Sequence, residues 1–184
     1  MSGNKENIIE TLLCAAEKSF TALFNEHSKE HFYYCTIVMA DGAAPCISAQ
    51  SEESLIKYLK DNNVSDSEIL DYKWSWADSY YCGYGYDEFF GEVAELFEKS
   101  FEDLWDDDVK FEQKYCEWFN AMETVMKILD EKGIFGVGDD RDRVFVYAEE
   151  SPPDEEFESQ YHERAERMNP SAVYKKWLAD QVIM

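Results

Sequence analysis

Residues 32–50 read FYYCTIVMADGAAPCISAQ and carry the clearest strand and turn signals of the chain. Residues 32–40 are almost all β-branched, aromatic or small and apolar, which predicts a buried strand. Asp41-Gly42 is a turn signal, because glycine readily takes the positive φ that tight hairpin turns require. Residues 45–50 then predict a returning strand. We therefore expect an antiparallel hairpin at the centre of the structure.

The segments before and after this hairpin have the periodicity of helices. Apolar residues recur at intervals of three and four, as on the buried face of an amphipathic helix. Ser51 is of a type that caps helix N-termini, and Asp87 is expected to cap a later helix. The predicted helices cover residues 5–27, 52–62, 88–105 and 109–131, the last ending at Gly133, and two short helices over 159–182 are separated at Asn169-Pro170.

Two further segments have the pattern of strands. Residues 71–78 (DYKWSWAD) alternate so that their aromatic side chains share one face, and residues 143–148 (RVFVYA) are rich in β-formers. Helices and strands are mixed without a regular strand–helix–strand rhythm. The sequence therefore predicts a single α+β domain over residues 1–184, with an antiparallel sheet of about four strands packed with several long helices.

Charge is the most unusual property of the composition. The chain of 184 residues carries 40 acidic and 17 basic residues, a net charge of −23 at pH 7 and a pI near 4.3. Such a surface repels phosphate backbones and anionic membranes, so nucleic acid and membranes are not expected as partners. A partner that uses this charge is expected to be a basic protein.

The sequence also bears on cellular location. Residues 1–7 are polar and no run approaches the length of a membrane span, so neither a signal peptide nor a membrane helix is predicted. Five cysteines are scattered without a C-x-x-C pair, which predicts reduced, mostly buried thiols in a cytosolic protein. They are Cys14, Cys35, Cys46, Cys82 and Cys116.

Residues 27–31 (HSKEH) match the H-x-x-E-H spacing that places two imidazoles beside a carboxylate in some zinc sites. Such a site needs both histidines on one continuous helix and a third ligand farther along. The strand predicted from Phe32 puts His31 at the helix end, and His162 is isolated. A small metal-dependent hydrolase using His27 and His31 stays as an alternative, but no metal or other cofactor is predicted.

Other catalytic patterns are missing from the sequence. It has no G-x-S-x-G motif, and the glycine-containing segments 83–91 and 133–140 match neither a P-loop nor a dinucleotide fingerprint. Cys35 and Cys46 fall in predicted strands, where buried thiols are inert. Carboxylates are too numerous for any pair to be singled out. The sequence therefore predicts a protein that is not an enzyme.

The acidic residues gather in two segments. Between Asp87 and Asp108 there are ten acidic residues and one lysine, and residues 149–158 form a predicted acidic loop with six acids and no base. These carboxylates either form a solvated face or the footprint of a basic partner, which charge would steer into rapid association. The candidate partner-binding carboxylates are Asp87, Glu88, Glu92, Glu95, Glu98 and Glu102.

Aromatic residues precede the first acidic segment. Trp74 and Trp76 are expected on one face of the predicted third strand, and a glycine-containing loop follows them. Its tyrosines could be core residues or anchors for a partner, since tyrosine is common at interface hot spots. The candidate anchors are Tyr80, Tyr81 and Tyr84.

Several segments together resemble a known bacterial family. They are FYYCTIVMADGAAPCISAQSEESL at 32–55, YKWSWADSYY at 72–81, VFVYAEES at 144–151 and RMNPSAVYKKW at 167–177. In order and spacing these segments are similar to the bacterial domain of unknown function numbered 4303, over most of the chain. Some members of that family are similar to immunity proteins encoded beside polymorphic toxins, and the family has no established catalytic residues.

The resemblance implies a cytosolic immunity protein that binds and neutralises a cognate toxin domain, often a basic nuclease. The charge of the chain points to the same kind of partner. We therefore expect the acidic surface and its neighbouring tyrosines to bind a basic toxin domain. A general protein-binding module without a toxin partner is a further alternative, and the oligomeric state is left open.

Overall fold

A three-stranded sheet lies at the centre of the computed structural model, which describes residues 2–40, 42–104, 106–151 and 158–181. The strands are β1 (Phe32–Ala40), β2 (Cys46–Ser51) and β3 (Phe145–Ser151), in the order β2-β1-β3. The predicted hairpin is confirmed, because β1 and β2 are antiparallel with Ile37 opposite Ile47. Gly42 has a φ of +74°, while Asp41 lies outside the described residues.

The third strand is not antiparallel to β1, as β2 is. β3 runs parallel to β1, with Tyr34 beside Phe145 and Ile37 beside Ala148. A sheet of about four antiparallel strands was therefore the wrong prediction. The chain between β2 and β3 crosses the fold several times as helices, and a long helical connection is what allows a parallel return.

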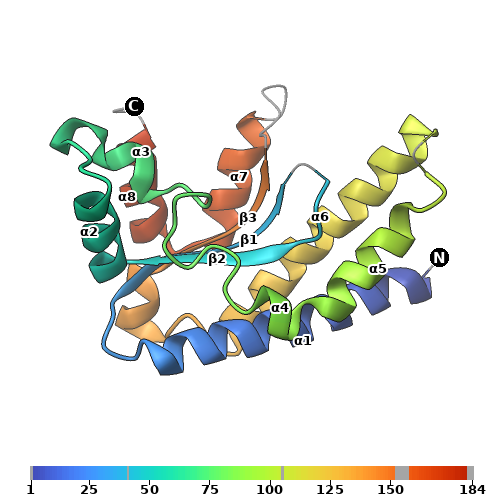
Figure 1. Ribbon diagram of the computed structural model, residues 1–184, viewed down its shortest axis with the longest axis horizontal. Coiled ribbons are helices and arrows are strands. Elements are labelled where there is room, and N and C mark those ends of the chain that lie inside the picture. The colour runs from blue at the N-terminus through green and yellow to red at the C-terminus, as the bar shows by residue number, and fades with distance from the viewer. Residues whose placement is uncertain (1, 41, 105, 152–157, 182–184) are drawn as a thin grey trace.

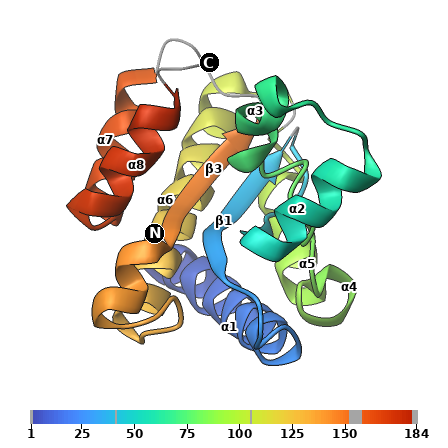
Figure 2. The ribbon, with the colours of Figure 1, turned by 90° about the vertical axis from the view of Figure 1, so that its left-hand side faces the viewer.

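Helices cover both faces of the sheet (Figure 1). α1 (Ser2–Glu26) and α6 (Asp108–Glu131) lie side by side under one face, with α5 (Gly91–Phe101) along their flank. α3 (Ile69–Lys73) and α8 (Ser171–Gln181) cover the other face, where Trp74 and Trp177 pack against Phe145. α7 (Glu158–Met168) lies beside β3, and α2 (Glu52–Asp61) lies toward β2 (Figure 2). Short helices complete the chain: η1 (Asp66–Glu68), α4 (Tyr86–Phe89) and η2 (Gly138–Arg143).

Several predicted helix ends are confirmed in detail. The Ser51 hydroxyl accepts a hydrogen bond from the amide of Ser54 at 2.9 Å, as the expected cap of α2. α6 stops at Glu131, and Gly133 follows with a φ of +77°. The two C-terminal helices separate at Asn169-Pro170 as predicted.

Asp87 does not cap the acidic helix. It lies inside the four-residue α4, and α5 begins only at Gly91. Gly85 precedes α4 with a φ of +69°, and a Cβ there would come within 2.7 Å of Ser19 Oγ and of the Phe89 ring. The chain reverses here because only glycine fits the close approach to α1, a tertiary requirement that the capping pattern does not carry.

Residues 71–78 are not a strand, contrary to the alternation of their side chains. They form the end of α3 and an irregular turn, in which the Asp78 amide donates to Ser75 Oγ at 3.2 Å and the Ser75 hydroxyl donates to Asp78 at 2.8 Å. Such local side-chain hydrogen bonds compete with strand pairing. Trp74 packs edge-on against Tyr33 and Tyr34, so it is half-buried against the sheet without belonging to a strand.

Other groups cover the two outer strands where a fourth strand was expected. The amides of Tyr81 and Gly83 donate to the β2 carbonyls of Ala49 and Ile47 at 3.3 and 2.9 Å. On β3, the Asn169 side-chain amide bonds both the N–H and the carbonyl of Val146, each at 2.8 Å. These contacts occupy part of each sheet edge, which would otherwise offer a template for another strand.

The remaining expectations concern the acidic loop, the thiols and the membrane. Residues 149–151 belong to β3, and residues 152–157 lie outside the described part of the chain. The cysteines are free, but the prediction of mostly buried thiols is wrong, because three are exposed and only Cys35 is fully buried. Among the described residues, no helix combines the length and the apolarity that crossing a membrane requires.

Candidate functional site

The outer face of α5 carries the predicted acidic surface. Three exposed glutamates on it, and a fourth directly after its last residue, form no ion pair with another described residue: Glu92, Glu95, Glu98 and Glu102. The opposite face of α5 is buried through Val93, Phe97 and Phe101. The neighbouring α6 differs, because its lysines pair with nearby acids, as Lys114 does with Glu117 at 2.5 Å. Lys99 is the one basic residue of α5 and borders the same hollow as Glu92 and Glu95, so this face keeps a net negative charge.

Asp87 and Glu88 extend this charge onto α4, where both are exposed. The structure thus places all six candidate carboxylates at the surface, on two helices that follow one another along the chain. Like charges spaced three or four residues apart weaken an isolated helix slightly. Packing of the apolar stripe of α5 on α1 and α6 supplies the stability that this charge pattern lacks.

The three candidate tyrosines have different environments. Tyr80 is 44% exposed, and its hydroxyl lies 2.5 Å from Lys57 Nζ. Tyr81 is only 6% exposed and donates to the Glu30 carboxylate at 2.8 Å. Tyr84 is half-buried and donates to Glu26 at 2.6 Å. Tyr80 is therefore the anchor candidate that a partner could reach directly, whereas the hydroxyls of Tyr81 and Tyr84 bind the C-terminal end of α1 and the turn after it.

The two histidines of the H-x-x-E-H segment do not converge. His27 follows the end of α1, and its Nδ1 lies 3.2 Å from Glu30. His31 is exposed, and its Nδ1 lies 2.6 Å from Glu53 on α2. The hydrogen bond with Glu53 raises the pKa of His31. Within the described part of the chain, no group of three or more histidine, cysteine or acidic side chains is arranged to hold a metal ion.

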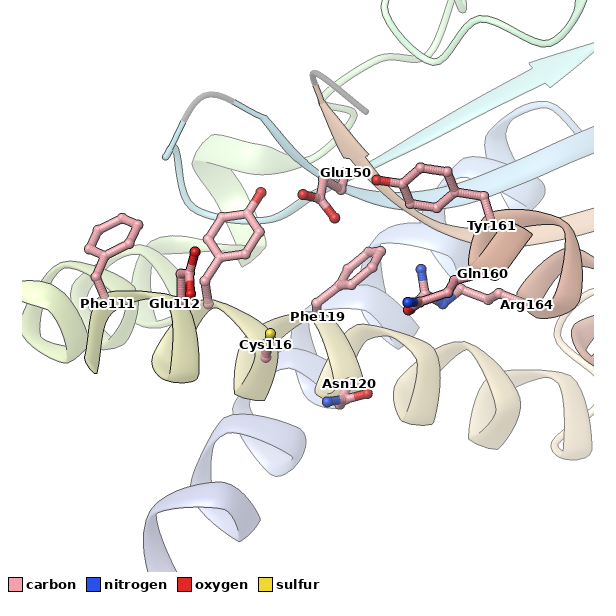
Figure 3. A pocket seen from close by; sticks show the side chains of 10 residues that line it. Phe111, Glu112, Cys116, Phe119, Asn120, Glu150, Gln160, Tyr161 and Arg164 are labelled. Atoms are coloured by element: carbon pink, nitrogen blue, oxygen red, sulfur yellow. The ribbon is translucent and has the colours of Figure 1, made fainter. Parts of the chain in front are cut away.

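A groove of about 430 Å³ lies between α6, the end of β3 and α7. An aromatic ridge on α6, at intervals of four residues, forms one side of it: Phe111, Tyr115 and Phe119. Figure 3 shows Phe111 and Glu112 at one end, Arg164 and Tyr161 at the other, and Glu150 between them. The sequence predicts these α6 aromatics only as part of a buried stripe. Their exposure to a groove depends on where α7 packs.

Arg164 is the buried cation at the inner end of this groove. Its residue is 7% exposed, its guanidinium stacks 3.9 Å from the centre of the Phe119 ring, and its Nε donates to Glu123 at 3.1 Å. Burial alone would raise the pKa of Glu123, but hydrogen bonds from Arg167, Lys127 and Arg164 outweigh it and hold that pKa at about 2. Glu123 is therefore ionised and neutralises part of this cationic cluster.

A smaller pocket of about 160 Å³ lies on the opposite face of the sheet, between α3 and α8. Glu149 borders it and accepts a hydrogen bond from the buried Tyr34 hydroxyl at 2.5 Å. Burial raises the pKa of Glu149 to about 7, although the hydrogen bond from Tyr34 acts in the opposite direction. Glu149 and Glu150 are neighbours on β3, so the alternation of the strand sends one toward each of the two pockets.

The family model described as a domain of unknown function (DUF4303) matches residues 12–170. The chain belongs to this family. The match leaves out the first ten residues of α1 and the last helix, α8, but includes the sheet, α5, α6 and α7, so both the acidic face and the groove lie inside the family domain. No curated protein and no solved structure matches the DUF4303 chain.

Proposed function

We propose that this DUF4303 protein is a non-enzymatic inhibitor that binds a basic partner protein through its acidic surface. The observation that carries the proposal is the acidic face of α5, where four exposed glutamates form no ion pair with another described residue and Lys99 is the one basic residue of the helix. A helix face with net negative charge attracts lysine and arginine side chains of a partner, and complementary charge raises association rates.

The partner class follows from the resemblance described above, which implies an immunity protein for a bacterial toxin domain. A toxin that acts on nucleic acid carries cationic residues around its active site. The α5 carboxylates would pair with those residues and exclude the nucleic acid. Exposed Tyr80 would supply an aromatic anchor toward the same partner, since its ring stands at the surface.

The test begins with capture of partners by the tagged protein in its native host and their identification by mass spectrometry. The captured partner is then purified, and its association rate is measured by stopped flow at low and high salt. We expect association to slow as salt rises while dissociation changes little. We also expect stoichiometric loss of the partner's activity and rescue of growth when both proteins are expressed together.

A pair of charge-matched variants makes this test specific. The first replaces the four α5 glutamates (Glu92, Glu95, Glu98 and Glu102) by glutamine. The second replaces four exposed aspartates on other elements (Asp61, Asp71, Asp139 and Asp142) by asparagine, which removes the same total charge. The α5 variant is expected to associate at least about tenfold more slowly at low salt, and the control only slightly. Equal effects of the two variants, or an association rate that does not change with salt concentration, would contradict the proposal.

A further inference from the structure

Glu149 presents a carboxylate oxygen to the pocket of about 160 Å³ between α3 and α8. Its Oε2 accepts from the Tyr34 hydroxyl at 2.5 Å, whereas no described residue donates a hydrogen bond to its Oε1. The buried polar side-chain atoms that lack a partner belong to other residues, namely Gln50, Trp118 and Arg164. Oε1 of Glu149 is therefore not enclosed by protein, and a ligand in the pocket can reach it.

The charged side chains that line this pocket are both acidic. They are Glu149 and the exposed Asp71, and neither forms an ion pair with another described residue. Lys73 lies over the ring of Trp74, with Nζ 5.2 Å from the ring centre, but it pairs with Asp180 at 2.6 Å. Burial raises the pKa of Glu149 to about 7, as expected for a carboxylate without a cation beside it.

Aromatic rings form much of the remaining wall. The Phe145 ring stacks on Trp177 with ring centres 5.0 Å apart and meets Trp74 edge-on at 5.6 Å. Both tryptophans are half-buried and line the pocket, one from each side of the sheet strand that carries Glu149. Aromatic surfaces hold the alkyl stem of a ligand and attract its cationic head.

This lining suits an organic cation with an N–H donor. Two carboxylates among aromatic rings are too few for Ca²⁺, which takes about six to eight oxygen ligands. An engineered cavity of about 150 Å³ in another protein binds benzene, so this pocket has room for roughly five or six heavy atoms. Oε1 of Glu149 accepts an N–H, which a primary ammonium has and a quaternary ammonium lacks.

We propose that this pocket binds a primary alkylammonium, with its head at Glu149 Oε1 and its short stem along Trp74 and Trp177. The ligand is a free small amine or a lysine side chain of another protein, which share this chemistry. The inference does not rest on the proposed function, because α5 lies with α1 and α6 on the other side of the sheet (Figure 1). The bound ammonium would supply the counter-charge that Glu149 lacks.

The probe is n-butylammonium, titrated at pH 8 and constant ionic strength into the isotope-labelled full chain. The indole N–H signals of Trp74 and Trp177 and the backbone amides of residues 145–149 report on the pocket. We expect shifts there, with a dissociation constant on the order of 1–10 mM for so small a ligand. The neutral n-butanol, which has the same number of heavy atoms, is expected to bind about fivefold more weakly or worse, and so is tetramethylammonium.

A lysine with acetyl and methylamide caps distinguishes the two sources of the ammonium. It is expected to bind at least as tightly as n-butylammonium if the pocket takes a lysine side chain from another protein. Binding of n-butylammonium together with much weaker binding of the capped lysine would assign the pocket to a free amine, because the attached backbone then does not fit.

Binding should strengthen as pH rises. The ammonium binds the ionised form of Glu149, whose folded pKa is about 7, and the ammonium itself stays charged below pH 9. Between pH 8 and pH 5.5 the ionised fraction of Glu149 falls by more than about tenfold, so the dissociation constant should rise by about tenfold or more. The same titration repeated at the two pH values measures this change.

Other titratable groups surround Glu149: Tyr34 on β1, Tyr147 on β3, Asp71 and Lys73 on α3, and Asp180 on α8. Burial raises the pKa of both tyrosines, so they stay protonated up to pH 8. Lys73 and Asp180 already pair with each other. Loss of the pH dependence in Glu149→Gln would therefore assign the titration to Glu149.

Two neighbouring residues of β3 provide matched variants. Glu149→Gln keeps an acceptor for Tyr34, and it is expected to weaken binding at pH 8 by about tenfold or more. Glu150→Gln removes the same charge from a side chain that strand alternation directs to the other face, and it should change the dissociation constant by less than about twofold. Trp177→Leu is expected to weaken binding about twofold to fivefold. Thermal melts of each variant establish that the chain is folded.

Several outcomes would overturn this inference. They are n-butanol or tetramethylammonium binding as tightly as n-butylammonium, no shifts at Trp74 and Trp177, an affinity that does not change with pH, and equal effects of Glu149→Gln and Glu150→Gln. Each of these results would leave the proposed function standing, because the measurements involve neither the basic partner nor the glutamates of α5.

Discussion

Glu123 on α6 and Glu149 on β3 have opposite environments. Glu123 is 8% exposed and accepts hydrogen bonds from three cations, with Arg167 Nη2 and Lys127 Nζ both at 2.6 Å. Glu149 borders a pocket and has the Tyr34 hydroxyl at 2.5 Å. The pKa of the first is held at about 2, and that of the second is raised to about 7.

The difference shows how the chain distributes few cations among many carboxylates. With 40 acids and 17 bases, most acids cannot have a cationic partner. Three cations gather on Glu123, and several other acids accept hydrogen bonds from tyrosine hydroxyls instead. The tyrosine–carboxylate pairs are Tyr34–Glu149, Tyr58–Asp78, Tyr81–Glu30 and Tyr84–Glu26. This arrangement leaves the glutamates of the α5 face at the surface without an ion pair to another described residue.

The largest effect on stability is expected from Glu123→Ala. It would leave Arg164 buried without its carboxylate, and such a loss costs about 3–5 kcal/mol in the free energy of unfolding. Urea unfolding at pH 7 measures this change. A loss below about 1 kcal/mol would show that Arg164 reaches water or another acid when Glu123 is removed.

Glu149→Gln is expected to raise the free energy of unfolding, whereas Glu123→Ala lowers it. The folded pKa of Glu149 is about 7 against an ordinary 4.5, so the wild type loses stability as pH rises from 4.5 to 7, by about 3 kcal/mol in total. Glutamine keeps an acceptor for Tyr34 and carries no charge. We therefore expect the variant to be more stable than the wild type at pH 8 and similar to it at pH 4.5. Urea unfolding of the variant and the wild type at pH 4.5 and pH 8 tests this expectation. An equal difference in unfolding free energy at both pH values would contradict the raised pKa of Glu149.

The contributions of Glu123 and Glu149 to the free energy of unfolding change with pH in opposite directions. The folded pKa of Glu123 is lowered to about 2, so its contribution is complete above 4.5 and is lost as pH falls toward 2. The combined contribution of the pair is thus largest near pH 4.5. Comparing unfolding free energies of wild type, Glu123→Ala and Glu149→Gln from pH 3 to pH 8 separates the two slopes.

Tyr34→Phe tests how much the hydrogen bond from Tyr34 contributes to the environment of Glu149. It removes the hydroxyl that donates to Glu149, and the loss of one such hydrogen bond costs about 1 kcal/mol at pH 8. The bond favours the ionised carboxylate, so the pKa of Glu149 should rise further. Carboxyl-carbon NMR titration follows the pKa directly, and a fall would mean that the hydroxyl acts chiefly on the protonated acid.

The smallest expected effect is that of Lys127→Met. The Lys127 side chain is 45% exposed although it pairs with Glu123, and exposed pairs contribute about 0–1 kcal/mol. We expect a change in unfolding free energy within this range, well below that of Glu123→Ala. A cost as large as that of Glu123→Ala would show that the three cations act as one cooperative unit.

Local patterns in the sequence were sufficient for much of the fold. The hairpin, the Ser51 cap, α1, α6 and the paired C-terminal helices follow from periodicity, capping chemistry and turn residues. The failures are the predicted strand over 71–78, the Asp87 cap and the direction of β3. Contacts with distant residues decided the Asp87 cap and the direction of β3, as Gly85 against α1 illustrates. The strand over 71–78 was prevented by the local hydrogen bonds between Ser75 and Asp78 together with the packing of Trp74 on the sheet.

The candidate site divides in the same way. The acidic face of α5 could be read from composition and helical spacing, because exposed charge on an amphipathic helix is a local property. The groove could not, because it requires α7 to place Arg164 over Phe119, 45 positions earlier in the chain. The pairings of Glu123 and Glu149 depend equally on residues far away in sequence.

Neighbouring residues are enough to account for the helices, the central hairpin, the negative charge and the segments in which that charge is concentrated. Which carboxylates receive cations, which accept from tyrosines and which remain at the surface depends on how the elements pack. The reason is physical: ionisation and accessibility depend on burial and on partners in space, and packing alone brings those partners together.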